Sequence, residues 1–217
     1  MDIKAFIFDL DGVITDTAEL HYQAWTQLAQ QEGLTFSREI NERLRGVTRR
    51  VSLQIMLDES GRTIDEATAE VWMTRKNEAY RAMLHDLTPA DALPGVPEFL
   101  REARAAGIKI GLGSASRNAR DVLTSLQLID AFDAIGDGNS VVNSKPAPDL
   151  FVWVAGALGI SPAAGLVFED AEAGVEAALA GGFRVVGIGS ANVDKAHFVV
   201  PGIKALTVAE VISRLSK

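Results

Sequence analysis

The sequence contains no cysteine among its 217 residues, so disulfide bonds and thiolate metal sites are excluded. No apolar run approaches the roughly 20 residues needed to cross a bilayer, and Asp9 and Asp11 interrupt the apolar start of the chain, unlike a signal peptide. Basic residues are too few to balance the acidic ones, and a formal net charge of −8 argues against binding to nucleic acid. We therefore expect a cytoplasmic protein that binds neither membranes nor nucleic acid.

Hydrophobic residues make up 47% of the chain, which is typical of a globular protein with a substantial core. Near the start, an almost continuous apolar run reaches Phe8 with only Lys4 inside it. Such a run predicts a strand that is buried on both faces, as in a parallel sheet. Asp9 and Asp11 follow where this strand should end, and Gly12 permits a tight turn directly after them.

The spacing of Asp9 and Asp11 makes their charges share one small space, because side chains at i and i+2 of an extended chain point the same way. That is unfavourable unless a cation lies between them, one is protonated, or one carries an electrophile. Taken alone, such a pair more often consists of solvated acids at the end of a strand.

The rest of the chain divides by its periodicity. Residues 15–88 show helical patterns and no strand, with Thr17 as the N-cap of the first helix. After Pro89, strands alternate with helices, which predicts a parallel, doubly wound α/β sheet of the Rossmann-like kind. We therefore expect a catalytic core of residues 1–14 and 89–217 and an inserted all-helical cap of residues 15–88.

Polar residues follow four of the expected strands: Asp9 and Asp11; Ser114 and Ser116; Lys145; Glu169 and Asp170. Open α/β sheets bind their ligands at the carboxyl ends of the strands, so these groups should converge. Clustered carboxylates favour Mg²⁺, and the lysine can steady a nucleophilic carboxylate or a phosphoryl oxygen. Serine hydroxyls and the start of a helix suit a phosphate. The set predicts phosphoryl transfer through an aspartyl-phosphate.

This order of residues resembles the haloacid dehalogenase superfamily over the whole chain. Asp9 and Asp11 match its first motif, Ser114 its second, Lys145 its third, and Glu169 with Asp170 its fourth. The resemblance implies Asp9 as nucleophile and Asp11 as general acid and base. It also implies Mg²⁺ bound by Asp9, the Asp11 carbonyl, Glu169 and Asp170.

Within the superfamily, the chain resembles the β-phosphoglucomutases, which interconvert β-glucose 1-phosphate and glucose 6-phosphate through glucose 1,6-bisphosphate. The resemblance adds Thr17 and His21 of the linker region to the catalytic set of Asp9, Asp11, Ser114 and Lys145, with His21 in the hinge that positions Asp11. The sugar phosphate is then expected to contact Arg45, Gly46, Val47, Thr48, Arg49, Ser52, Lys76, Ser114, Ala115, Ser116, Arg117 and Asn118. A guanidinium on the cap turn can bind the distant phosphate in a bidentate manner.

Arg45 and Arg117 stand where that family usually has lysine, which keeps the charge but alters reach and geometry. A sugar-phosphate phosphatase would use the same four motifs and is the main alternative; the cap turn and His21 favour the mutase. A phospho-receiver domain combines similar residues, but it needs neither Asp11 nor a helical insertion. We expect a monomer that acts on a small sugar phosphate.

Overall fold

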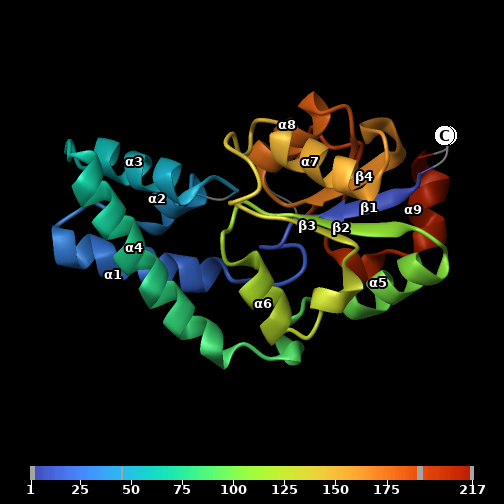
Figure 1. Cartoon of the computed structure of the whole chain (residues 1–217), viewed down its shortest axis with the longest axis horizontal. Coiled ribbons are helices and arrows are strands. Elements are labelled where there is room, and N and C mark those ends of the chain that lie inside the picture. Colours follow the sequence, from blue (N-terminus) through green and yellow to red (C-terminus); the bar gives the residue numbers. More distant parts are fainter. Residues whose placement is uncertain (1–2, 45, 190–192, 216–217) are drawn as a thin grey trace.

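The computed structural model of the chain describes residues 3–44, 46–189 and 193–215. Its centre is a six-stranded sheet with the strand order β3-β2-β1-β4-β5-β6, and its neighbouring strands pair in parallel (Figure 1). The strands are β1 (Ala5–Phe8), β2 (Lys109–Gly113), β3 (Ala134–Gly136), β4 (Gly165–Glu169), β5 (Arg184–Ile188) and β6 (Phe198–Val200).

Strand β1 is buried on both faces, as its apolar run predicts. Its side chains alternate between two hydrophobic clusters: Phe6 and Phe8 belong to one, Ala5 and Ile7 to the other. Helices cover both faces of the sheet (Figure 1). Those of the first cluster are α5 (Val96–Ala105), α6 (Ala119–Ser125) and α9 (Val208–Leu215); those of the second are α7 (Asp149–Leu158) and α8 (Glu172–Ala180).

Four helices lie between β1 and α5, to one side of the sheet (Figure 1). They share a separate hydrophobic cluster that includes Trp25, Leu53 and Trp72. In the described residues this segment contributes no strand to the sheet. The helices are α1 (Ala18–Glu32), α2 (Arg38–Glu42), α3 (Arg49–Glu59) and α4 (Glu66–Met83), followed by the short 3₁₀ turn η1 (Leu84–Asp86).

The two chain segments that join these helices to the sheet lie side by side. The Leu93 amide donates to the Ile14 carbonyl over 2.8 Å, and the Thr15 hydroxyl donates to the Asp91 carbonyl over 2.8 Å. An isolated antiparallel bridge joins Thr15 to Ala92. The helical insertion is therefore attached through a hydrogen-bonded pair of linkers.

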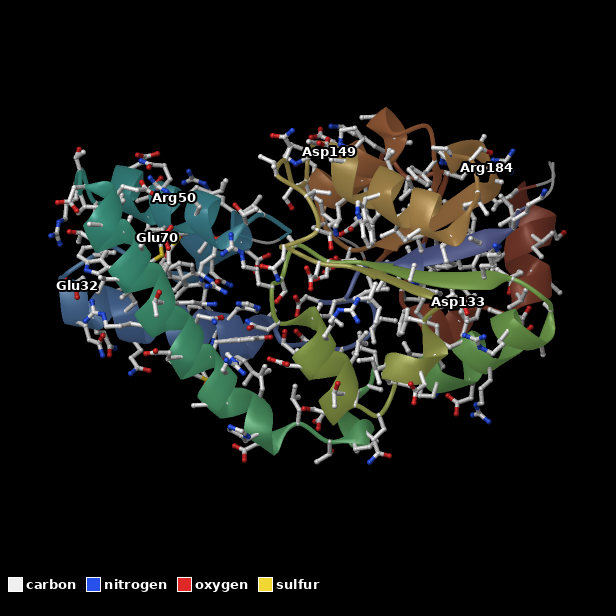
Figure 2. All side chains as sticks on the ribbon, in the orientation of Figure 1. Glu32, Arg50, Glu70, Asp133, Asp149 and Arg184 are labelled. Atoms are coloured by element: carbon white, nitrogen blue, oxygen red, sulfur yellow. The ribbon has the colours of Figure 1, made fainter. Side chains whose placement is uncertain are left out.

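The predicted fold class, a doubly wound parallel sheet with a helical insertion, is confirmed. The sequence patterns missed β6, which has only three residues at the edge of the sheet. The boundaries 1–14, 15–88 and 89–217 stay a prediction. Figure 2 shows Arg50 and Glu70 on the cap helices and Asp149 and Arg184 on the sheet-bearing part. Among the described helices, none has the length and apolar character that a membrane crossing requires.

Candidate active site

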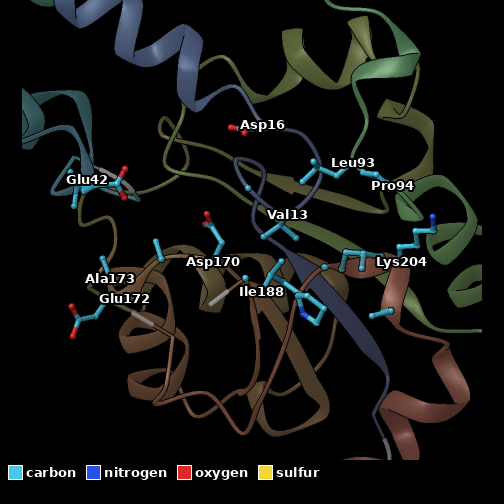
Figure 3. A pocket seen from close by; sticks show the side chains of 18 of the residues that line it. Val13, Asp16, Glu42, Leu93, Pro94, Asp170, Glu172, Ala173, Ile188 and Lys204 are labelled. Carbon is cyan, nitrogen blue, oxygen red and sulfur yellow. The ribbon is translucent and has the colours of Figure 1, made fainter. Parts of the chain in front are cut away.

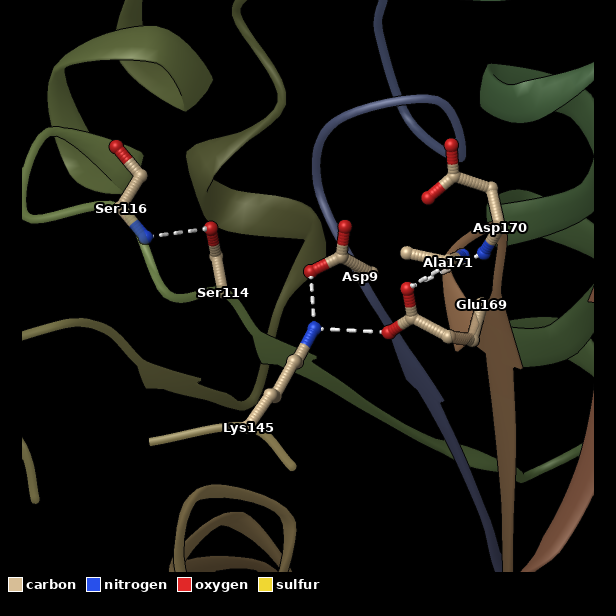
Figure 4. Close-up of polar contacts among 7 residues, drawn as sticks. All are labelled: Asp9, Ser114, Ser116, Lys145, Glu169, Asp170 and Ala171. Atoms are coloured by element: carbon tan, nitrogen blue, oxygen red, sulfur yellow. Dashed lines mark hydrogen bonds and ion pairs between the residues drawn. The ribbon is translucent and has the colours of Figure 1, made fainter. Parts of the chain in front are cut away.

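The end of β1 places Asp9 beside a buried lysine (Figure 4). Lys145 Nζ lies 2.5 Å from Asp9 Oδ1 and 2.8 Å from Glu169 Oε2, and all three side chains are almost fully buried. Burial alone would lower the pKa of the Lys145 ammonium, but Asp9 and Glu169 together raise this pKa above its ordinary value. Lys145 therefore stays charged and holds the Asp9 carboxylate in one orientation.

Carboxylate oxygens of Asp9, Glu169 and Asp170 lie within 4.8 Å of one another, which suits one metal ion. Glu169 is fixed by the amides of Asp170 and Ala171, which both donate to its Oε1 (Figure 4). Burial and the charge of Asp9 raise the pKa of the Glu169 carboxyl above its ordinary value. A bound cation would oppose this shift, because positive charge stabilises carboxylates. An all-oxygen acidic set of this kind fits Mg²⁺.

Ser114 and Ser116 come directly after β2, the strand that pairs with β1 (Figure 4). The Ser116 amide donates to Ser114 Oγ over 3.2 Å, and the Asn118 amide donates to Ser116 Oγ over 3.2 Å. These local bonds orient both hydroxyls just before α6 begins. Because the carboxyl ends of neighbouring parallel strands lie side by side, a phosphoryl group on Asp9 would lie close to these hydroxyls.

Asp11 accepts a hydrogen bond from the Thr17 hydroxyl, and Thr17 in turn accepts one from Tyr80 Oη over 3.1 Å. Thr17 is the N-cap residue of α1, as predicted, but its side chain makes no capping hydrogen bond. Asp16 Oδ1 instead accepts from the Ala18 amide. Burial, helped by the charge of Asp9, raises the pKa of the Asp11 carboxyl to about 7. A group with that pKa exchanges protons readily near neutral pH, as an acid–base catalyst must.

Lys76 and His21 form a close pair between α4 and α1, with 2.6 Å between Lys76 Nζ and His21 Nδ1. Burial, followed by the charge of Lys76, holds the pKa of His21 well below its ordinary value. Burial and the charge of Arg49 likewise hold the pKa of Lys76 well below its ordinary value. Neutral His21 therefore accepts a hydrogen bond from Lys76, which also lies 5.0 Å above the Trp25 ring.

Asn77 links the cap to the core. Its Oδ1 accepts from Arg49 Nη2 over 2.7 Å and from Asn118 Nδ2 over 2.8 Å. Burial and the charge of Arg117 lower the pKa of Arg49, so the two guanidinium groups repel each other across the site. Such a pair of cations favours an anionic group between them.

A cavity of about 630 Å³ connects these groups, a size typical of small-molecule sites. It is lined by most of the predicted site residues: Asp9, Asp11, His21, Gly46, Val47, Thr48, Arg49, Ser52, Lys76, Ser114, Ala115, Ser116, Arg117 and Asp170. Thr17, Asn118, Lys145 and Glu169 are buried behind these residues. Arg45, predicted to contact the sugar phosphate, lies outside the described residues.

The sequence analysis gives no role to several other residues of the site. Asn77 and Tyr80 lie on α4 near Lys76, and their hydrogen-bond partners stand 28 to 63 positions away in the chain. Val141 and Val142 line the cavity from the loop after β3, and Val142 is almost fully exposed. The helical spacing of Lys76 and Tyr80, four residues apart, is the one signal that could have indicated Tyr80.

A larger cavity of about 930 Å³ lies beside the linkers and at the carboxyl ends of β4, β5 and β6 (Figure 3). Leu93 and Pro94 line it from the second linker, and Ile188 lines it from β5. Asp170 and Val47 line both cavities. Asp9, Ser114 and Arg49 line the smaller one, so the predicted chemistry belongs there in spite of its lesser volume.

A sequence model described as haloacid dehalogenase-like hydrolase matches residues 3–182. The chain belongs to this family. It is 46% identical to a β-phosphoglucomutase of Bacillus subtilis over 189 residues, which cover 86% of this chain and 84% of that protein. It is 31% identical to a phosphorylated carbohydrates phosphatase of Thermotoga maritima, with 99% of each chain covered.

Among solved structures, the chain resembles a β-phosphoglucomutase of Clostridium difficile. The TM-score is 0.95 at 37% identity, with 99% of this chain and 97% of that chain covered. The resemblance to the haloacid dehalogenase superfamily and to the β-phosphoglucomutases is therefore confirmed. The individual roles of the site residues stay predictions.

Proposed function

We propose that the protein is a Mg²⁺-dependent phosphomutase that converts β-glucose 1-phosphate into glucose 6-phosphate. One observation carries this proposal: a single cavity joins Asp9 and Asp11 of the core to Arg49 and Lys76 of the cap. A mutase must hold one phosphoryl group at its nucleophile and a second one at a distance. A cavity with acids beside a buried lysine at one end and cations at the other meets that requirement.

Asp9, Glu169 and Asp170, with the main-chain carbonyl of Asp11, would hold the Mg²⁺. When bound, the ion would neutralise the charge of the phosphoryl oxygens beside Asp9. Lys145 contributes a fixed positive charge at the same carboxylate. Ser114 and Ser116 donate hydrogen bonds to the phosphoryl group being transferred.

The reaction starts from the enzyme phosphorylated on Asp9. The C6 hydroxyl of β-glucose 1-phosphate attacks the phosphorus, Asp11 takes the hydroxyl proton, and the bond between phosphorus and Asp9 breaks. The resulting glucose 1,6-bisphosphate turns round. Asp9 then attacks the C1 phosphoryl group, Asp11 returns its proton to the leaving O1, and glucose 6-phosphate departs. Arg49 and Arg117 hold the phosphate that does not react in each half-reaction.

The test is phosphorus NMR of the purified protein with Mg²⁺, β-glucose 1-phosphate and a trace of glucose 1,6-bisphosphate. Glucose 6-phosphate with little inorganic phosphate supports the mutase. Inorganic phosphate as the main product would overturn it in favour of a sugar-phosphate phosphatase, the activity for which the Thermotoga maritima relative is named.

A further inference from the structure

Tyr80 stands where the cap helix α4 reaches the core. Its side chain is completely buried and belongs to the hydrophobic cluster that contains Leu10 and Ile14, which lie one residue before and three residues after Asp11 in the sequence. Trp72 and Met73, about two turns earlier on α4, belong to the separate cluster of the cap. The helix therefore passes from one cluster to the other between Met73 and Tyr80, and the Tyr80 ring is packed in the cluster that contains β1 residues.

The hydroxyl of Tyr80 begins a chain of hydrogen bonds that ends on Asp11. Tyr80 Oη donates to Thr17 Oγ1 over 3.1 Å, and Thr17 Oγ1 donates to Asp11 Oδ1. A threonine hydroxyl has a single proton, so receiving a bond from Tyr80 leaves that proton for Asp11. Burial raises the pKa of Tyr80 above its ordinary value, which keeps this hydroxyl a donor.

The ring of Tyr80 supports the other pair at the site. It stacks on His21 with 4.0 Å between ring centroids and 25° between planes. Lys76 Nζ lies 4.9 Å from the centre of the Tyr80 ring and 2.6 Å from His21 Nδ1. The Tyr80 side chain thus contacts Thr17, which binds Asp11, and also His21 and Lys76, which line the cap side of the cavity.

We propose that Tyr80 is a positioning residue that couples the cap helix to the orientation of Asp11. Its hydroxyl directs the Thr17 proton to Asp11, and its ring fixes the His21–Lys76 pair. Movement of α4 relative to the sheet must therefore change two sets of contacts together: the hydrogen bonds from Tyr80 through Thr17 to Asp11, and the ring contacts with His21 and Lys76. Tyr80 contacts no reacting atom and acts through Thr17 and His21. This inference rests on the proposed function, in which Asp11 moves the proton.

Tyr80→Phe removes the hydroxyl that donates to Thr17 and keeps the ring that stacks on His21. With β-glucose 1-phosphate as substrate, we expect kcat to fall about fivefold, the effect of one buried hydrogen bond, while KM stays within about twofold. The matched control is Tyr22→Phe at the only other tyrosine of the chain, whose ring stacks on Phe36 of the cap. This control should keep both constants. An unchanged kcat in Tyr80→Phe, or a loss confined to KM, would overturn the proposal.

A double-mutant cycle separates positioning from a general loss of stability. Thr17→Val breaks the hydrogen-bond chain at its middle, so Tyr80→Phe should cause no further loss of kcat in the Thr17→Val background. If the two losses instead multiply, Tyr80 does not act through Thr17 and the proposal is wrong. Melting temperatures of all four proteins show that each is folded at the assay temperature.

The same assay distinguishes failure of the inference from failure of the proposed function. If the unaltered protein releases inorganic phosphate in place of glucose 6-phosphate, the mutase assignment fails. The cycle is then read on phosphate release, because Asp11 also handles the proton of the attacking water in hydrolysis. If Tyr80→Phe then causes no further loss of phosphate release in the Thr17→Val background, the positioning role is kept. If the two losses multiply, the positioning role is wrong.

Discussion

Gly46 of the cap turn and Ala171 of the loop after β4 approach each other closely. A Cβ atom on Gly46 would lie 3.2 Å from the Cβ of Ala171, tighter than most real contacts. Gly46 also has φ of 72°, a left-handed conformation that favours glycine. Ala171 directly follows the predicted metal ligands Glu169 and Asp170. The cap turn therefore rests on the same loop that positions the acidic cluster.

Gly46→Ala should weaken this approach of the cap to the core. We expect KM for β-glucose 1-phosphate to rise at least about threefold, because a well-packed contact costs about 1 kcal/mol or more to disturb. The matched control is Gly61→Ala, since Gly61 has a similar φ of 59° but open space around its Cβ position. Both variants should lose similar stability in urea titrations. Equal values of KM in the two variants would show that the contact does not matter for binding.

Arg49→Ala should damage the mutase reaction far more than the hydrolysis of a small phosphate ester. Arg49 lines the cavity from the cap, and a small ester bound at Asp9 does not reach it. Loss of a charged hydrogen bond to the distant phosphate should lower kcat/KM by about tenfold to a hundredfold for β-glucose 1-phosphate.

Arg50→Ala is the control for that variant. Arg50 also lines the cavity, but its guanidinium is paired with Glu66 at 3.0 Å (its place on the cap is seen in Figure 2). Kinetics of both variants with β-glucose 1-phosphate and with p-nitrophenyl phosphate give the comparison. A similar loss in both reactions of Arg49→Ala would contradict a phosphate clamp on the cap.

Asp9→Asn should abolish phosphoryl transfer while the fold is kept. The amide cannot act as a nucleophile, so we expect turnover to fall about a thousandfold or more. The control Asp121→Asn changes an exposed carboxylate on α6 that faces Arg81 and should keep full activity. Incorporation of labelled phosphate from glucose 1,6-bisphosphate measures the phosphorylated enzyme directly. Labelling of Asp9→Asn at the level of the unaltered protein would exclude Asp9 as the nucleophile.

The core half of the site could be predicted because parallel strands converge at their carboxyl ends. Asp9, Ser114 and Glu169 each stand at the end of an expected strand, which is enough to predict that they lie close together. In the structure Asp9 and Glu169 both accept hydrogen bonds from Lys145, and Ser114 follows β2, the strand beside β1. No such rule applies to the helical insertion. A threonine before a helix is typical of an N-cap, so the bond of Thr17 to Asp11 depends on tertiary structure that local pattern does not contain.

The same reasoning explains why the sequence analysis gives no role to Asn77 and Tyr80. Asn77 joins Arg49 of α3 to Asn118 of the core, and no spacing within α4 indicates either partner. Tyr80 has the helical spacing of a buried residue, which it is, but its hydroxyl partner is 63 positions away. Side chains that bridge two units are set by the packing of those units, which sequence periodicity does not describe.

The low pKa of His21 should make the stability of the protein sensitive to acid. An unfolded histidine takes up a proton as the pH falls below about 6.5, whereas His21 in the folded protein stays neutral well below that value. The unfolded state then binds more protons, so the contribution of His21 is present above pH 6.5 and is lost as the pH falls. The slope is about 1.4 kcal/mol per pH unit wherever the unfolded histidine is protonated and His21 in the folded protein is neutral.

His21→Gln keeps an acceptor for Lys76 but does not titrate, so its free energy of unfolding should fall less between pH 7 and 5 than that of the unaltered protein. Urea titrations at each pH give the two curves, and their difference isolates His21 from the other titrating groups. His85→Gln, at an exposed position of η1, is the control and should follow the unaltered protein. Parallel curves for His21→Gln and the unaltered protein would mean that His21 is free to take up a proton in the folded state. In that case Lys76 would need a different partner at low pH.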